Sequence, residues 1–143
     1  MKRSLLVEAD GGPLAVVIAG ANMPDVYLLA PTLDATALER PPSEDDWLQH
    51  LCLDKGYDNR LGWGACAEYG YVPHIARIRD ERPPRPKHHA PRRWVVERTL
   101  GWLSKCRALL VRWDKKACNY LGLLQLACAL LWFRRYHRLA GLR

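Results

Sequence analysis

The sequence lacks any Cys-x-x-Cys pair: its five cysteines are scattered singly at Cys52, Cys66, Cys106, Cys118 and Cys128. A structural zinc site needs clustered ligands, and a disulfide framework needs cysteines that pair. An odd, isolated set argues against both kinds of site. We expect reduced cysteines that fill apolar positions, because this residue is usually buried.

A secretion signal and a membrane span are also lacking. The apolar run near the start, 4–7, ends at Glu8 and is too short for a signal peptide. The most apolar stretch, 120–133, is shorter than the roughly 20 residues that cross a bilayer. We therefore expect a buried core helix at 120–133 and a cytoplasmic protein without membrane contact.

Acidic residues become scarce in the second half of the chain. Residues 1–76 contain 5 Lys/Arg and 11 Asp/Glu, a net charge of −6, whereas residues 77–143 contain 17 and 4, a net charge of +13. Such asymmetry indicates a polyanionic partner, and nucleic acid is the commonest one. A solvated basic face or a surface for anionic lipid would produce the same pattern.

Short apolar runs separated by turn signals predict an α/β sheet in residues 1–76. The expected elements are a hairpin of 4–7 and 14–19, a helix after Asp25, a surface loop at 40–46, a strand at 50–54, a helix at 58–69 and a strand at 71–75. The strand at 50–54 is a short apolar run that ends on Asp54, which favours a buried parallel strand.

The second half is predicted to be helical. Residues 77–93 contain four prolines and many basic residues, which favours a mobile basic connection. One amphipathic helix is expected from Arg92 through Val111, ending near Lys115. A last helix is expected from Asn119 to Leu139, where its basic end suits the negative end of the helix dipole.

Two acidic residues are candidate metal ligands. Asp54 follows a predicted strand, at the edge where α/β folds bind ligands, and Glu97 is the lone acid of a basic helix. Each also has a structural interpretation: Asp54 as the cap of the next helix, and Glu97 as the ion-pair partner of Arg93. Facing carboxylates hold two Mg²⁺ ions in enzymes that cleave phosphodiesters.

Several blocks together resemble the DDE transposases of bacterial insertion sequences over nearly the full length. They are Lys2–Val7, 20–22 with Asp25, Leu-Cys-Leu-Asp-Lys-Gly-Tyr-Asp at 51–58, Arg-Arg-Trp-Val-Val-Glu-Arg-Thr at 92–99 with 102–103, 112–116 and 126–130. The resemblance implies an RNase H-like fold with three catalytic acids and two Mg²⁺ or Mn²⁺ ions. It also implies cleavage of double-stranded DNA at transposon ends and joining to target DNA in the nucleoid.

By this resemblance Asp54 matches the second catalytic Asp and Glu97 the catalytic Glu, and both would bind metal. The family's Tyr-Arg-Glu-Lys helix signature keeps its Arg at Arg93, whereas Ala90 and Ser104 replace its Tyr and Lys, and Lys105 lies one residue further. The expected DNA-binding residues are Arg92, Arg93, Trp94, Arg98, Lys105 and Arg107.

The family's first catalytic Asp precedes the segment that resembles Lys2–Val7 and has no counterpart in this chain; Glu8 and Asp10 are poor substitutes. We therefore expect an N-terminally truncated RNase H-like domain with a helical C-terminus, incomplete or inactive alone, partnered by an upstream-frame product or a second copy. The alternative is a non-catalytic DNA-binding protein that uses its basic C-terminal half.

Overall fold

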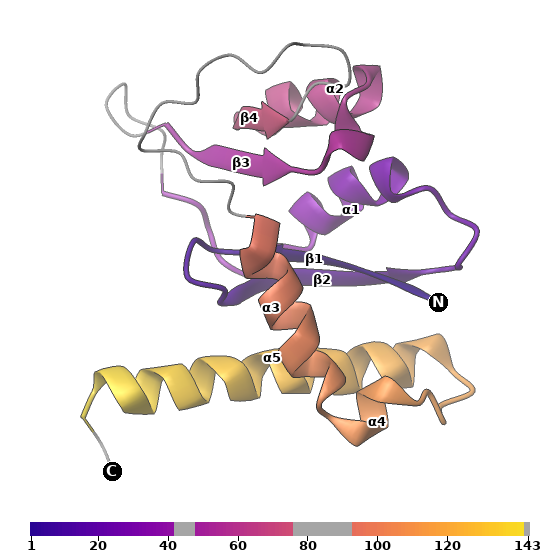
Figure 1. Ribbon diagram of the computed structural model, residues 1–143, viewed down its shortest axis with the longest axis vertical. Helices are drawn as coiled ribbons and strands as arrows, with labels where there is room; N and C mark the ends of the chain where they lie inside the picture. Colours follow the sequence, from indigo (N-terminus) through magenta and orange to yellow (C-terminus); the bar gives the residue numbers. More distant parts are fainter. Residues whose placement is uncertain (42–47, 76–92, 142–143) are drawn as a thin grey trace.

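A β-hairpin lies at the centre of the computed structural model, which describes residues 1–41, 48–75 and 93–141 (Figure 1). Strands β1 (Lys2–Val7) and β2 (Pro13–Ala19) pair antiparallel. At the turn, Gly11 has a φ of 94°, a left-handed conformation that glycine adopts without strain. The predicted hairpin is confirmed.

A second, parallel pair of strands lies beyond the hairpin. Strands β3 (His50–Leu53) and β4 (Val72–Ile75) are joined by the 3₁₀ turn η2 (Lys55–Tyr57) and helix α2 (Arg60–Glu68). The predicted parallel strand is confirmed, but it is not fully buried, because Leu51 is its only buried residue.

The two pairs of strands form separate sheets: among the described strands, no ladder joins β1 or β2 to β3 or β4. The 3₁₀ turn η1 (Asp25–Leu28) and helix α1 (Leu29–Asp34) bridge them instead. An apolar cluster of Leu29, Leu33, Leu51 and Cys66 fills this region, and Leu6 of β1 packs against it. Side-chain packing therefore connects the two sheets.

The helical second half covers the other face of the hairpin (Figure 1). Its elements are α3 (Arg93–Ser104), α4 (Arg107–Leu110) and α5 (Ala117–Leu139). The single helix predicted from Arg92 to Val111 is wrong, because the chain is extended at Cys106. At 100° per residue, Leu103 and Leu109 would lie on different faces of one continuous helix. The break lets both side chains enter the same core.

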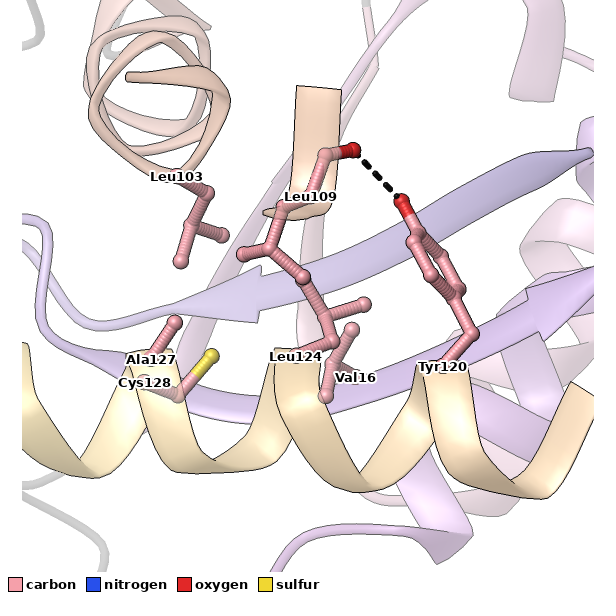
Figure 2. Packing of buried hydrophobic residues seen from close by; sticks show 7 residues of the cluster. All are labelled: Val16, Leu103, Leu109, Tyr120, Leu124, Ala127 and Cys128. Atoms are coloured by element: carbon pink, nitrogen blue, oxygen red, sulfur yellow. Dashed lines mark hydrogen bonds between the residues drawn. The ribbon is translucent and has the colours of Figure 1, made fainter. Parts of the chain in front are cut away.

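That core lies between the hairpin and the three helices (Figure 2). Its buried members are Val16, Leu103, Leu109, Tyr120, Leu124, Ala127 and Cys128. The Tyr120 hydroxyl donates a hydrogen bond of 3.0 Å to the Leu109 carbonyl oxygen, so its polar group is satisfied inside the core. α5 supplies four of these side chains and is the main cover of β2.

Helix α5 confirms the last predicted helix and begins two residues earlier, but it is not buried all round. Leu126, Leu130 and Phe133 are exposed. By length and composition alone α5 is long and apolar enough to cross a membrane, a test that core helices of globular proteins also pass. One face packs against the hairpin, which corrects the expectation of a fully buried helix.

The cysteines correct a second expectation. Cys66 and Cys128 are buried, as predicted, and burial raises the pKa of the Cys128 thiol to about 11. Cys52, Cys106 and Cys118 are exposed instead. Cys52 alternates with the buried Leu51 along β3, and the other two lie at the ends of helices, where no apolar layer covers them.

Candidate active site and nucleic-acid interface

Asp54 lies where the sequence predicts, directly after β3. Its backbone is extended, and its carboxylate accepts a hydrogen bond of 2.6 Å from the Lys55 amide, which caps the turn η2. Asp54 is therefore a cap, as its structural interpretation proposed, but of this 3₁₀ turn and not of the predicted helix, whose cap is Asn59. The carboxylate is also exposed, so capping does not remove it from solvent or from a ligand.

The rest of the Asp-Lys-Gly-Tyr-Asp block forms a hydrogen-bonded corner beside Asp54. Asp58 accepts a hydrogen bond of 3.0 Å from the Trp63 indole, and Asn59 caps α2. Burial raises the pKa of Tyr57, and the carboxylates of Asp25 and Asp54 add to the rise. Asp25 therefore lies near this corner, a neighbour that sequence reasoning had assigned only to a helix start.

Glu97 lies on the exposed side of α3. The next two residues fix α3 on the hairpin turn: Thr99 donates a hydrogen bond of 2.8 Å to the Gly11 carbonyl oxygen, and Arg98 donates one of 2.6 Å to the Asp10 carbonyl oxygen. Thr99 and Val95 are both buried. Because the turn anchors α3, the position of Glu97 is set relative to the β1–β2 sheet.

Asp54 and Glu97 belong to different parts of the fold. Asp54 follows β3, whereas α3 packs on β1. Among the described residues, no group of three or more His, Cys, Asp or Glu side chains lies close enough to hold a metal ion. The two acids therefore do not belong to a complete metal-ligand set made of described residues.

The expected DNA-binding residues gather on α3 and at the junction with α4. Trp94, Arg98, Lys105 and Arg107 are exposed there. Arg93 is the first residue of α3, and Arg92, like most of the predicted connection at 77–93, lies outside the described residues. Lys105 follows the end of α3, so it is not one helical step further along, as the sequence suggested.

The structure gives Glu8 and Asp10 another role, which sequence reasoning missed. Glu8 accepts hydrogen bonds from the amides of Asp10 (2.9 Å) and Gly12 (2.8 Å), and an ion pair joins it to Arg135 of α5. Arg135 also contacts the Asp10 carboxylate at 3.1 Å. Burial alone would raise the pKa of Glu8, but these hydrogen bonds and the guanidinium hold it below its ordinary value.

Two further features have no counterpart in the sequence prediction. On neighbouring parallel strands, His50 Nδ1 and His74 Nε2 are 2.7 Å apart. An apolar pocket of about 480 Å³ lies between β2 and α5, lined among others by Pro13, Ala129 and Trp132. Neither Asp54 nor Glu97 lines this pocket, so it is separate from the candidate acids.

Comparison with known proteins places the chain in a family. Residues 1–132 match the family described as "Transposase DDE domain". A Burkholderia cepacia protein described as "Putative transposase for insertion sequence element IS402" is 32% identical over 146 residues. The alignment covers 96% of this chain and 64% of the relative, so the chain spans less than two thirds of that protein's length. No solved structure matches the chain.

The matched region includes the hairpin, the Asp54 corner and the whole of α3. It covers far more than half of the sequence, and the relative exceeds 30% identity. The resemblance inferred from the sequence blocks is confirmed: the chain belongs to the transposase DDE domain family.

Proposed function

We propose that this chain is a portion of a DNA transposase with an RNase H-like architecture, in which Asp54 and Glu97 are two of the catalytic acids. The observation that carries the proposal is the family match over residues 1–132, with both acids exposed on a strand end and on an anchored helix. Double-stranded DNA is the proposed substrate. A second polypeptide or a second copy would complete the assembly in the nucleoid.

The donor chemistry of the two acids fits Mg²⁺ or Mn²⁺. Both are carboxylates, the ligands that these hard cations prefer, and Mg²⁺ sites often use only one or two protein carboxylates together with water and substrate phosphate. When bound, such ions activate the attacking oxygen and stabilise the leaving oxygen of a phosphodiester. Glu8 is not the family's remaining acid in this proposal, because the hairpin turn and Arg135 already engage its carboxylate.

The basic residues of α3 have a complementary role. Arg98 and Lys105 would neutralise backbone phosphates and fix the register of the duplex relative to Glu97. Arg98 is already oriented by its hydrogen bond to the Asp10 carbonyl oxygen, so little rotamer entropy is lost when it binds phosphate.

The metal site is tested by calorimetric titration with Mn²⁺. We expect Asp54→Asn and Glu97→Gln each to weaken binding about tenfold or more, which corresponds to about 1.4 kcal/mol, because each removes a charged oxygen ligand. Glu68→Gln, which changes an exposed acid on α2, is the matched control and should leave the isotherm unchanged. Unaltered isotherms for both site variants would make the two acids structural.

The DNA-binding role is tested by the salt dependence of duplex affinity. We expect log K to fall linearly with log salt concentration, by about 0.9 for each phosphate neutralised. Arg98→Ala and Lys105→Ala should each reduce the slope by about 1. Arg60→Ala, an exposed basic residue on α2, should not change it. Affinity that does not respond to salt would refute contact with the phosphates.

A non-catalytic DNA-binding protein is the second candidate. It is favoured by the capping role of Asp54 and by the lack of a three-ligand metal group among the described residues. The two candidates separate experimentally, because this second candidate keeps salt-dependent duplex binding while Asp54→Asn leaves metal binding unchanged.

A further inference from the structure

We propose that the exposed face of α3, formed by Trp94, Arg98, Gly101 and Trp102, binds unpaired bases of the DNA, an inference that rests on the proposed DNA-binding function. At 100° per residue these four positions fall on one side of the helix. Val95, Thr99 and Leu103 fall in the adjoining sector of the helix and are buried. The sequence of α3 thus separates a packed side from an exposed aromatic side.

Exposed tryptophans are the first observation behind this inference. Trp94 is 55% exposed and Trp102 is 46% exposed, although tryptophan gains more than almost any other side chain from burial. Flat aromatic rings at a surface stack on bases, and this interaction tolerates any base because every base has a π face. In an intact duplex the bases stack on each other, so the rings need unpaired bases.

Arg98 restrains the Trp94 ring and adds a positive charge to this face of α3. Its guanidinium lies 4.7 Å from the centre of the Trp94 ring, and its hydrogen bond to Asp10 ties it to the hairpin turn. A ring held in place by a cation loses less conformational entropy on stacking. The same guanidinium can contact the phosphate of the nucleotide whose base stacks on Trp94.

Gly101 is the second observation. A glycine in the middle of a helix is less favourable than alanine, and here the fold does not require it: a Cβ at this position would meet no other described atom within 4 Å. Gly62 of α2 differs, because a Cβ there would lie 2.2 Å from the Tyr57 carbonyl oxygen. The missing side chain of Gly101 leaves the helix backbone open to close approach by a ligand.

Charge favours DNA over a protein partner on this face. The half of the chain that contains α3 has a net charge of +13. Arg98 on this face and Lys105, directly after the end of α3, are exposed. A ligand with flat rings and a polyanionic backbone complements both features. If the face bound protein instead, its variants would change the oligomeric state in light scattering and leave DNA affinity unchanged.

The test compares a blunt duplex with the same duplex carrying a short single-stranded tail, by fluorescence anisotropy with the full chain. We expect Trp94→Ala and Trp102→Ala to weaken binding of the tailed duplex about tenfold, within the range for loss of one base–aromatic stack. The loss on the blunt duplex should be clearly smaller, because it offers no unpaired bases for stacking. Trp113→Ala is the control, because Trp113 is 82% exposed but lies outside α3.

A second pair of variants tests close approach. Gly101→Leu should weaken the tailed complex about tenfold by steric exclusion, whereas Gly122→Leu, an equally open glycine of α5, should not. Equal losses on both DNAs for the tryptophan variants, or no loss for Gly101→Leu, would overturn the inference. A change of oligomeric state in light scattering without a change in DNA affinity would overturn it too and identify a protein interface.

The failure of this inference and the failure of the proposed function look different. If the unsubstituted chain binds neither duplex, the DNA-binding function itself fails. If the chain binds both with strong salt dependence but does not discriminate the tailed duplex through Trp94 and Trp102, only the role of the α3 face fails. Trp94→Tyr should restore most of the affinity, because an aromatic ring is sufficient for stacking.

Discussion

Leu124→Ala should lower the free energy of unfolding by about 3 kcal/mol, within the usual range for a buried leucine. The side chain is 0% exposed and lies in the core between α5, α4 and β2 (Figure 2). Truncation removes apolar contacts and leaves a cavity that the anchored hairpin cannot fill by relaxing. Urea denaturation followed by far-UV circular dichroism measures the effect.

Leu126→Ala is the matched control for this prediction. It removes the same atoms two residues further along α5, where the side chain is 58% exposed, and surface substitutions change stability by less than about 0.5 kcal/mol. Similar losses for the two variants would contradict the packing of α5 on the hairpin through this face. That result would mean that α5 packs through the side whose leucines are exposed in this structure.

Glu8→Ala should have the second-largest effect, a loss of about 2 kcal/mol after allowance for screening by solvent. The substitution removes the acceptor of two backbone amides at the hairpin turn and the ion-pair partner of Arg135. Since Arg135 lies on α5, the variant weakens both the turn and its connection to the C-terminal helix. Asp10→Ala, which removes the more exposed carboxylate of the same cluster, should cost much less.

The pH dependence of this effect has a definite sign. Folding lowers the pKa of Glu8 below its ordinary value of 4.5, so its ionised form is favoured in the folded state. The contribution of the Glu8 carboxylate to the free energy of unfolding is therefore complete above the unfolded pKa. It disappears as the pH falls through the folded pKa. The difference in unfolding free energy between the wild type and Glu8→Gln should shrink in acid. A difference that stays constant to the lowest pH would contradict the role of the carboxylate.

The elements that could be predicted from sequence are those specified by local pattern. The hairpin, the strand that ends at Asp54 and the last helix follow from periodicity and turn residues, and the structure contains all three. The interruption after Ser104 could not be predicted, because it depends on where Leu109 finds a buried site beside α5. Local propensity contains no information on that contact.

The same division applies to the candidate site. The position of Asp54 directly after a strand was predicted, since strand end and acid are adjacent in sequence. The Glu8–Arg135 ion pair joins residues 127 positions apart, and the approach of Asp25 to Tyr57 depends on how two 3₁₀ turns pack. No pattern within a short window specifies such pairs. The shared metal role of Asp54 and Glu97 stays a prediction.

The separation of the two sheets affects how precisely the candidate acids are positioned. Asp54 belongs to the part built on β3, and Glu97 to the part anchored on the β1–β2 turn. Directional and apolar contacts both join the two parts: Thr32 of α1 donates a hydrogen bond of 2.7 Å to Ser4 of β1, and Tyr69 of α2 donates one of 2.5 Å to Asp34 of α1. The apolar cluster around Leu6, Leu33 and Leu51 packs between them. We expect these contacts to set the distance between the two carboxylates. Substitutions far from either acid can tune that distance by changing the shape of these side chains.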